Sequence, residues 1–182
     1  MLDKNSFLTG DLISLRGFQA DDLPGLYRWW DDERVTEFLE MGARPTRDKD
    51  ASAFLELARE SDDAVVFAIE EKDGGRVVGT CGLFSIGWIC RRAQFNILIG
   101  EPDAWDKGYG REAASLLLGY AFNKLNLNSV QLGVNADNKR AVRSCEKCGF
   151  VHEGVRRQFI YCGGRYHDTA MMSVLRDEFL AD

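Results

Sequence analysis

The sequence predicts one domain of the α/β (α+β) class, built as a mixed seven-stranded sheet flanked by helices. Its 182 residues are enough for one domain of ordinary size. No linker rich in Pro, Gly or Ser divides the chain, so residues 1–182 are expected to fold as one unit. Apolar residues recur with a helical period in some segments and alternate as in strands in others, which indicates helices packed on a sheet.

The N-terminal half predicts four strands and three helices. In the helices, apolar side chains recur every three or four residues, as with Leu23, Leu26 and Trp30. In the strands, short apolar runs end at turn residues, as at Gly74 and Gly75. The expected strands are residues 12–16, 64–71, 76–86 and 88–100, and the expected helices are residues 21–30, 31–39 and 49–61.

The C-terminal half predicts two helices and three strands, with glycines at the turns. Gly149 stands where glycine commonly follows the end of a helix, and Gly163 and Gly164 form a tight turn between the last two strands. An irregular loop is expected over residues 101–110. The expected helices are residues 111–125 and 139–147, and the expected strands are residues 129–134, 150–161 and 165–175.

Composition and charge argue against several classes of function. The chain carries 23 Lys and Arg against 29 Asp and Glu, a formal charge of −6. Affinity for polynucleotides comes mostly from neutralised phosphates, so this balance disfavours a nucleic-acid partner and suits an amine substrate better. The longest apolar run, residues 64–69, is far shorter than the roughly 20 residues of a membrane span. The N-terminal segment has no apolar core of signal-peptide length, so we expect a soluble, cytoplasmic protein without a membrane partner.

Five cysteines stand at irregular spacings. Cys145 and Cys148 form a C-x-x-C pair, but no second pair lies at the distance of a zinc finger or ribbon. Neither His152 nor His167 has a partner at metal-site spacing. We therefore expect reduced thiols and no metal site.

The most informative segment is the glycine-containing loop before the helix expected at residues 111–125. Gly108 and Gly110 stand at the start of that helix, where unpaired backbone amides and the helix dipole attract anions. Lys107 and Arg111 add positive charge beside them. The segment predicts a pyrophosphate site, although glycines that serve only turn geometry are the simpler alternative.

Two common phosphate-binding patterns fit this loop poorly. The segment from Gly108 matches the dinucleotide pattern G-x-G-x-x-[GA], and Asp137 lies near the distance of a ribose-binding acid. However, residues 100–107 separate the preceding strand from Gly108, whereas a dinucleotide turn follows its strand almost at once. A Walker loop is excluded because no Gly-Lys-Ser/Thr follows. A dinucleotide-dependent oxidoreductase is therefore the third hypothesis only.

Two motifs carry a resemblance to a known family. Trp105, Gly108 and Gly110 match [Gln/Arg/Trp]-x-x-Gly-x-Gly/Ala after a strand and before a long helix. The segment Asn138–Phe150 is similar to N-x-x-[AS]-x-x-x-[YL]-E-K-x-G-F. Together they resemble the motifs of the GNAT superfamily of acetyl-CoA-dependent N-acetyltransferases, and the resemblance covers about residues 10–176. The flanking segments are most similar to the ribosomal-protein N-terminal acetyltransferases and the spermidine N-acetyltransferases.

The resemblance implies acetyl-CoA as co-substrate, no metal, and direct attack of a neutral amine on the thioester. It implies that residues 98–100 present backbone donors to the thioester carbonyl, and that Cys145 stands where the family often has a catalytic tyrosine. A thiol of ordinary pKa is competent to protonate the leaving thiolate, and Cys145 as an inert apolar residue is the alternative. The implied cofactor-binding residues are Leu98, Ile99, Gly100, Trp105, Lys107, Gly108, Tyr109, Gly110, Arg111, Asn138 and Ala141.

The acceptor side is less well defined. Glu33 and Glu37 lie one helical turn apart in the segment that borders the substrate entrance in relatives, where they could hold a cationic amine. A solvated helix face is the alternative. Gln94 stands where the polyamine branch usually has an acidic residue. The expected acceptor is a primary amine, either a protein N-terminus or a small amine such as a polyamine, and a homo-oligomer is left open. The second hypothesis is a catalytically weak acyl-CoA-binding or sensing module.

Overall fold

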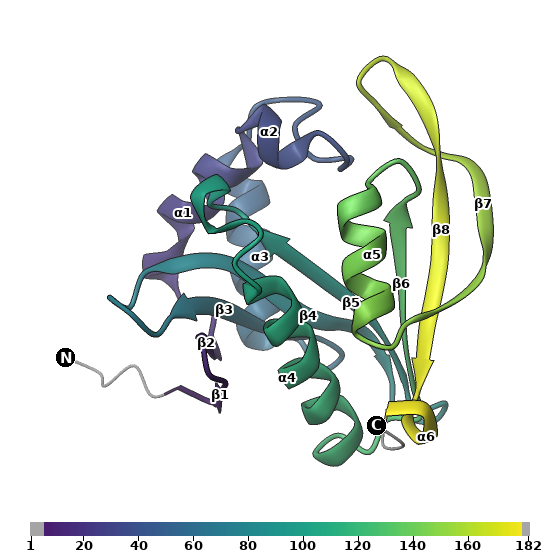
Figure 1. The fold of residues 1–182 in the computed structure, drawn as a ribbon. Helices are drawn as coiled ribbons and strands as arrows, with labels where there is room; N and C mark the ends of the chain where they lie inside the picture. The colour runs from purple at the N-terminus through teal and green to yellow at the C-terminus, as the bar shows by residue number, and fades with distance from the viewer. Residues whose placement is uncertain (1–5, 180–182) are drawn as a thin grey trace.

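The part of the chain that the computed structural model describes, residues 6–179, forms one eight-stranded sheet with helices on both faces (Figure 1). The strand order is β1-β2-β3-β4-β5-β6-β8-β7, and every neighbouring pair is antiparallel except β5 and β6. The mixed sheet of the predicted α/β (α+β) class is thus confirmed. Residues 1–5 and 180–182 lie outside the described residues. The expectations for the start of the N-terminal segment and for the outer ends of the domain fall on them.

The elements follow the predicted order. The strands are β1 (Leu8–Thr9), β2 (Ile13–Gly17), β3 (Val65–Glu71), β4 (Val77–Gly87), β5 (Arg92–Ile99), β6 (Ser129–Asn135), β7 (Val151–Cys162) and β8 (Arg165–Leu175). The helices are the 3-10 turns η1 (Ala20–Asp22) and η2 (Pro102–Ala104) and the α-helices α1 (Leu23–Trp30), α2 (Glu33–Thr36), α3 (Asp48–Glu60), α4 (Tyr109–Asn123), α5 (Lys139–Lys147) and α6 (Arg176–Phe179). None of the helices within residues 6–179 combines the length and the apolar character that crossing a bilayer requires.

Three details differ from the prediction. The sheet has eight strands rather than seven because the short strand β1 pairs with β2. Helix α2 is a single turn instead of spanning residues 31–39. Its start is set by Asp32, whose backbone is extended and whose carboxylate accepts the Arg34 N–H. Helix α4 begins at Tyr109, earlier than predicted, since Gly108 is its N-cap with a φ of +90°.

The sheet separates two apolar clusters. On one face, α4 packs the buried side chains of Leu117, Leu118 and Phe122 against the central strands. On the other face, α1 contributes buried Leu26 and Trp29, and α3 packs beside them. Each large apolar side chain that is fully buried stabilises the fold by roughly 1.5–3 kcal/mol. Both faces of the central strands are therefore committed to packing, and the site lies farther along the sheet.

The sheet opens between its two parallel strands. β5 and β6 pair over three residues each, and the pairing ends at Gln94 and Gln131. Beyond this point β5 stays paired with β4 as far as Ile99, whereas β6 stays paired with β8 as far as Asn135. The two strands therefore diverge, and α5 runs beside the opening (Figure 1).

Candidate active site at the opening of the sheet

Two cavities meet at the opening between β5 and β6. The first cavity, of about 760 Å³, lies between the start of α4, the length of α5 and the end of β5. The second cavity, of about 1060 Å³, lies between the segment that joins α2 to α3, the two diverging strands, and β7. The residues that line both cavities mark their junction, and they are Phe38, Leu39, Phe95, Ile97, Leu98, Asn138, Ala141 and Cys145.

The start of α4 offers backbone donors to the first cavity. Its N-cap, Gly108, has a left-handed φ of +90°, which residues with a side chain rarely adopt. The first helical hydrogen bond runs from the Glu112 N–H to the Gly108 carbonyl, so the amides of Tyr109, Gly110 and Arg111 have no acceptor within the helix. The helix dipole adds positive potential at the same place. These features suit the binding of an anion.

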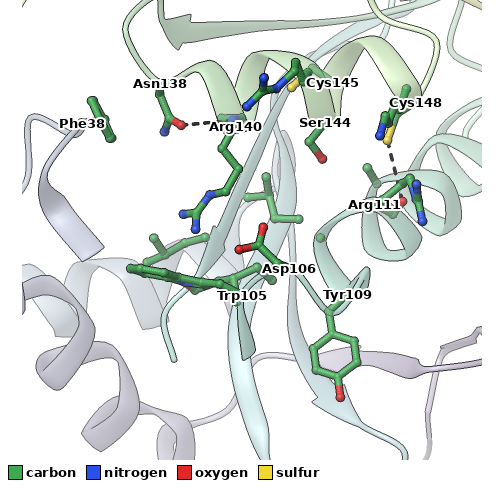
Figure 2. Close-up of a pocket in the computed structure, with 18 of the residues that line it drawn as sticks. Phe38, Trp105, Asp106, Tyr109, Arg111, Asn138, Arg140, Ser144, Cys145 and Cys148 are labelled. Carbon is green, nitrogen blue, oxygen red and sulfur yellow. Dashed lines mark hydrogen bonds between the residues drawn. The ribbon is translucent and has the colours of Figure 1, made fainter. Parts of the chain in front are cut away.

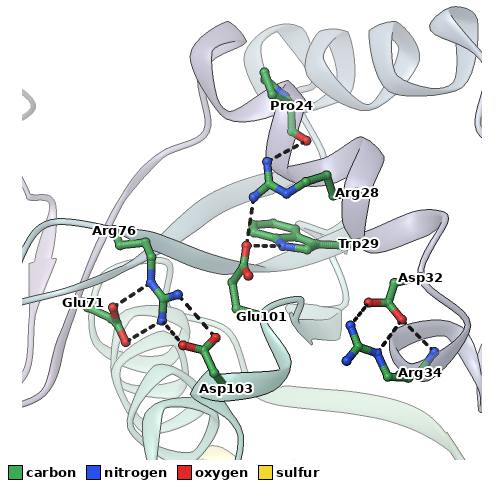
Figure 3. Close-up of polar contacts among 9 residues, drawn as sticks. All are labelled: Pro24, Arg28, Trp29, Asp32, Arg34, Glu71, Arg76, Glu101 and Asp103. Atoms are coloured by element: carbon green, nitrogen blue, oxygen red, sulfur yellow. Dashed lines mark hydrogen bonds and ion pairs between the residues drawn. The ribbon is translucent and has the colours of Figure 1, made fainter.

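The connection from β5 to α4 is held by α1 and by the β3–β4 hairpin. Glu101 accepts hydrogen bonds of 2.9 Å from the Arg28 guanidinium and from the Trp29 indole N–H. Asp103 accepts a hydrogen bond of 2.9 Å from Arg76, which lowers the pKa of the Asp103 carboxyl (Figure 3). The loop before α4 is therefore fixed by protein contacts, which reduces the entropy lost when a ligand binds there.

The first cavity is positively charged although the whole chain is acidic. Its basic lining residues, counted within residues 6–179, are Arg34, Arg111, Lys139, Arg140, Arg143 and Lys147. Two carboxylates, Glu37 and Asp106, line the same cavity. Most of the positive charge comes from α5, which faces the glycine-containing loop across the cavity (Figure 2). Free amides and clustered cations suit a ligand that carries several phosphate groups.

Arg140 and Trp105 meet at the rim of the first cavity. The Arg140 guanidinium lies 4.4 Å from the centre of the Trp105 ring, a cation–π distance (Figure 2). Trp105 is oriented by its indole N–H, which donates to the Ile99 carbonyl at 2.8 Å. This contact connects α5 with the loop before α4, so both walls of the cavity are positioned relative to each other.

The backbone of β5 presents donors to the opening. The Gly100 N–H donates to the Val78 carbonyl at 2.8 Å, toward β4. Hydrogen-bonding direction alternates along an antiparallel strand, so the Leu98 N–H also points toward β4. The N–H groups of Ile97 and Ile99 point the other way, into the opening. Residues 98–100 were expected to donate backbone N–H groups to the thioester carbonyl. Of these three residues, only Ile99 turns its N–H to the opening.

Asn138 stands at the junction as the N-cap of α5. Its side-chain Oδ1 accepts the Ala141 N–H at 3.0 Å, which satisfies one of the amides at the helix start. Capping uses the side-chain oxygen and leaves the amide nitrogen able to donate to a ligand. A capping role and a ligand-binding role are therefore compatible in one side chain.

Cys145 also lines the junction, but burial changes its chemistry. The thiol packs against the core on the α4 side, and this burial raises the pKa of Cys145 to about 12. Transfer of its proton to a thiolate whose conjugate acid has a pKa of about 8.5 is then unfavourable by roughly three orders of magnitude. The geometry favours the alternative in which Cys145 keeps its proton.

The five cysteines are free thiols. Cys148 also lines the first cavity, and its Sγ donates to the Arg111 carbonyl at 3.8 Å, from α5 to α4 (Figure 2). Within residues 6–179 no group of three or more His, Cys, Asp or Glu side chains is arranged to hold a metal ion.

The second cavity has a polar floor and aromatic walls. Gln94 and Asn96 of β5, Gln131 of β6 and Thr169 of β8 face it from the sheet. Its aromatic lining residues are Trp30, Phe38, Phe54, Phe84, Phe95 and Phe159. Its charged lining residues within the described chain are Glu40, Arg44, Asp50 and Arg156.

Most of the expected cofactor residues line the first cavity. They are Leu98, Ile99, Trp105, Gly108, Tyr109, Gly110, Arg111, Asn138 and Ala141. Gly100 and Lys107 lie outside the lining of both cavities, and the Lys107 ammonium lies 5.9 Å from the centre of the Tyr109 ring. Glu37 lines the first cavity rather than the second, and Glu33 lines neither. The structure therefore does not bring these two acidic residues to the second cavity.

The basic residues of α5 were missed by sequence reasoning. Lys139, Arg140, Arg143 and Lys147 are separated by one, three and four residues, which places them on one face of a helix. That stripe was a usable signal, because it opens immediately after the conspicuous Asn138. Arg34 carries no comparable signal, since α2 is a single turn whose direction depends on tertiary packing.

The opened parallel strand pair, with a glycine-capped helix beside it, defines an acetyltransferase of the GNAT class. The acetyltransferase (GNAT) domain matches residues 13–151, which is most of the chain. The protein therefore belongs to the GNAT acetyltransferase family, and its reaction is acetyl transfer from acetyl-CoA to an amine nitrogen.

Relatives with this fold are N-acetyltransferases. The uncharacterised N-acetyltransferase p20 of Bacillus licheniformis is 28% identical over 173 residues, covering 92% of this chain and 94% of that protein. The spermidine N(1)-acetyltransferase of Vibrio cholerae is 35% identical over 114 residues, covering 63% of this chain and 65% of that protein. The crystal structure of a Vibrio cholerae spermidine N-acetyltransferase in complex with CoA and spermine is similar with a TM-score of 0.84 at 27% identity, covering 94% of this chain and 99% of that chain. The resemblance to the spermidine branch is thus confirmed.

Proposed function

We propose that this enzyme acetylates a primary amine that enters through the second cavity and attacks the thioester directly at the junction. One observation carries the proposal: two cavities of different chemistry meet at the opening between β5 and β6. The relatives that act on spermidine support an amine acceptor. A protein N-terminus and a small amine such as a polyamine are the two candidate acceptors.

On the cofactor side, the amides of Tyr109, Gly110 and Arg111 bind the pyrophosphate, and the basic face of α5 neutralises the remaining phosphate charge. Three features suit this ligand: unpaired amides, positive charge, and a glycine where a side chain would narrow the cavity. A Cβ at Gly110 would lie 3.6 Å from Ile99 Cγ1. Bound acetyl-CoA supplies an activated acetyl thioester to the junction.

At the junction, backbone and side-chain groups act on the reacting atoms. The N–H groups of Ile97 and Ile99 stabilise the negative charge that develops on the thioester oxygen. The Asn138 amide nitrogen orients the ligand, and Cys145 keeps its proton. Gln94 and Asn96 cannot accept the proton of the amine, so they order a water that carries it to solvent.

The test is turnover of acetyl-CoA, followed as release of free thiol, over a panel of amines with the product read by mass. We expect acetylation of at least one amine and reduced turnover in Gly110→Val, whose side chain narrows the first cavity. Calorimetric binding of CoA without turnover of any amine would contradict the proposal. That result would support the acyl-CoA-binding or sensing module instead.

A further inference from the structure

The floor of the second cavity is a row of uncharged hydrogen-bonding side chains. Gln94 pairs with Gln131 across the parallel strands, and Asn96 follows on the same face of β5. Farther along β6, Asn135 pairs with Thr169 of β8 on that face. Carboxamides and hydroxyls both donate and accept hydrogen bonds, so this floor is complementary to neutral polar groups rather than to charge.

Thr169 supplies this floor with a buried hydroxyl that has no partner in the described part of the chain. Its side chain is only 3% exposed, and its hydroxyl has no hydrogen-bond partner among residues 6–179. The neighbouring Asn135 is already engaged, because its Oδ1 accepts the Asp137 N–H at 3.0 Å. Thr169 lines the second cavity beside Gly133, where an added Cβ would lie 3.0 Å from the Thr169 methyl group. Buried hydroxyls in native proteins are nearly always paired, so a donor or acceptor on a ligand would complete this one.

The charged groups of the second cavity do not match a polycation. Asp50 is engaged by Arg47 at 2.8 Å and lies 3.6 Å from Arg44. Glu40 is the other carboxylate in the lining, and Arg156, whose guanidinium lies 4.9 Å from the Phe159 ring centre, adds a positive charge to the same cavity. A polyamine carries several ammonium groups, each of which loses hydration unless a carboxylate compensates it. Within the described lining only Glu40 is a carboxylate without an ion-pair partner, which is fewer than a polyamine would require.

We infer that the acceptor is a primary amine whose other polar groups are uncharged hydroxyls or amides, and not a polyamine. This inference rests on the proposed function and names its substrate class. The amine nitrogen forms a bond to the acetyl carbon, the thioester C–S bond breaks, and its electron pair leaves with the CoA sulfur. The amine proton goes to water, and the rest of the acceptor is held by Gln94, Asn96, Gln131 and Thr169.

The first experiment compares kcat/KM for three acceptors: glucosamine, a short C-terminally amidated peptide beginning with Ser-Ala, and spermidine. We expect glucosamine or the peptide to exceed spermidine about tenfold or more, since a site built to pair neutral polar groups discriminates by those pairs. The sugar and peptide arms distinguish hydroxyl from amide recognition. Equal or higher kcat/KM for spermidine overturns the inference. If no amine is acetylated, the proposed function fails, and calorimetric affinities of the same three amines then decide the charge preference.

Substitutions at two floor positions test whether the floor of the second cavity binds the acceptor. Thr169→Val removes the hydroxyl and keeps the shape, so we expect KM for the preferred neutral acceptor to rise about tenfold, with Thr169→Ser restoring it. Because the hydroxyl is unpartnered in the free protein, Thr169→Val should not lower Tm, whereas a structural role would lower it. Gln94→Glu should raise the kcat/KM ratio of spermidine to the neutral acceptor. Unchanged acceptor constants in both Thr169→Val and Gln94→Glu would overturn the assignment.

Discussion

The two cavities share one opening in the sheet and differ in charge. The first is lined by six basic and two acidic residues of the described chain, and the second by two of each. The first gathers its positive charge mainly from one helix, α5, with Arg111 of α4 and Arg34 of α2, whereas the second takes most of its uncharged polar groups from the strands. A helix presents a stripe of like residues every three or four positions, and neighbouring strands present a flat array.

Because of this difference, the two cavities should bind their ligands by different interactions. A ligand with several phosphates is held by charge and by helix amides, which are strong and tolerant of small displacements. An acceptor with neutral groups is held by hydrogen bonds, which depend on direction and so on the register of the strands. Substitutions on each side should therefore change one Michaelis constant and spare the other.

The largest effect is expected at Gly110. Gly110→Val places a side chain against Ile97 and Ile99 in the first cavity, where a Cβ alone reaches 3.6 Å from Ile99. We expect CoA affinity to fall roughly 10- to 100-fold, because fitting extra methyl groups where the bound pyrophosphate packs costs about 1–3 kcal/mol. Calorimetry measures this. Gly108→Ala is the matched backbone control. Gly108 has a φ of +90°, which alanine adopts only with strain, so this variant should also lower Tm. Unchanged CoA affinity in Gly110→Val would contradict the phosphate site.

Removing one positive charge from each cavity should give the second-largest effect. Arg143→Gln, on the α5 face of the first cavity, should raise KM for acetyl-CoA roughly three- to tenfold and weaken its salt dependence. Arg156→Gln is the matched variant of the second cavity, and it should change only the acceptor constants. The comparison fails if both variants shift the same constant.

Asn138 belongs to both cavities, so its two roles can be separated by substitution. Asn138→Ala removes the side-chain oxygen that accepts the Ala141 N–H. The loss of this cap should lower the free energy of unfolding by about 1 kcal/mol, or Tm by about 2–4 °C. Asn138→Ser keeps a cap and should hold Tm. A raised KM for acetyl-CoA in Asn138→Ser then supports the ligand role, and an unchanged KM leaves the cap as the only role.

A smaller effect is expected at Cys145. With the pKa of its thiol at about 12, Cys145 stays protonated at neutral pH and does not supply the proton of the leaving group. Cys145→Ala should keep kcat within about twofold, and the pH–rate profile should keep its shape. A tenfold fall in kcat, restored by Cys145→Tyr, would instead identify an acid at this position.

The smallest effect concerns the turn that joins the two cavity walls. Asp137, just before the α5 cap, pairs with His167 at 2.9 Å and with Arg165 at 3.2 Å on β8. The hydrogen bond from His167 lowers the pKa of Asp137 below its unfolded value. Its contribution to stability is therefore present above about pH 4 and lost as pH falls through the folded pKa. Urea unfolding at several pH values should show less loss in acid for Asp137→Asn, and an identical pH dependence would contradict this.

Local chemistry accounts for what was predicted correctly. The α5 end was predicted from Gly149, whose positive φ of +88° few other residues adopt, whereas Gly108, with a φ of +90°, caps α4 earlier than predicted. The succession of strands along the chain could be predicted because apolar alternation and turn glycines act over only a few residues. The helix predicted over residues 31–39 was too long because its apolar spacing suggested more turns; the Asp32 cap starts α2 at Glu33, and the helix ends at Thr36.

By itself, the sequence determined the order of the elements along the chain, the glycines at the start of α4 and the family motifs, because each depends on neighbouring residues. Tertiary structure alone decided which side chains share a cavity. It placed Glu37 in the first cavity, left Glu33 outside both cavities, and buried Cys145, which raises the pKa of its thiol to about 12. Charge in a cavity and desolvation of a thiol are sums over groups distant in the chain, so they exist only once the strands have diverged and the helices have packed.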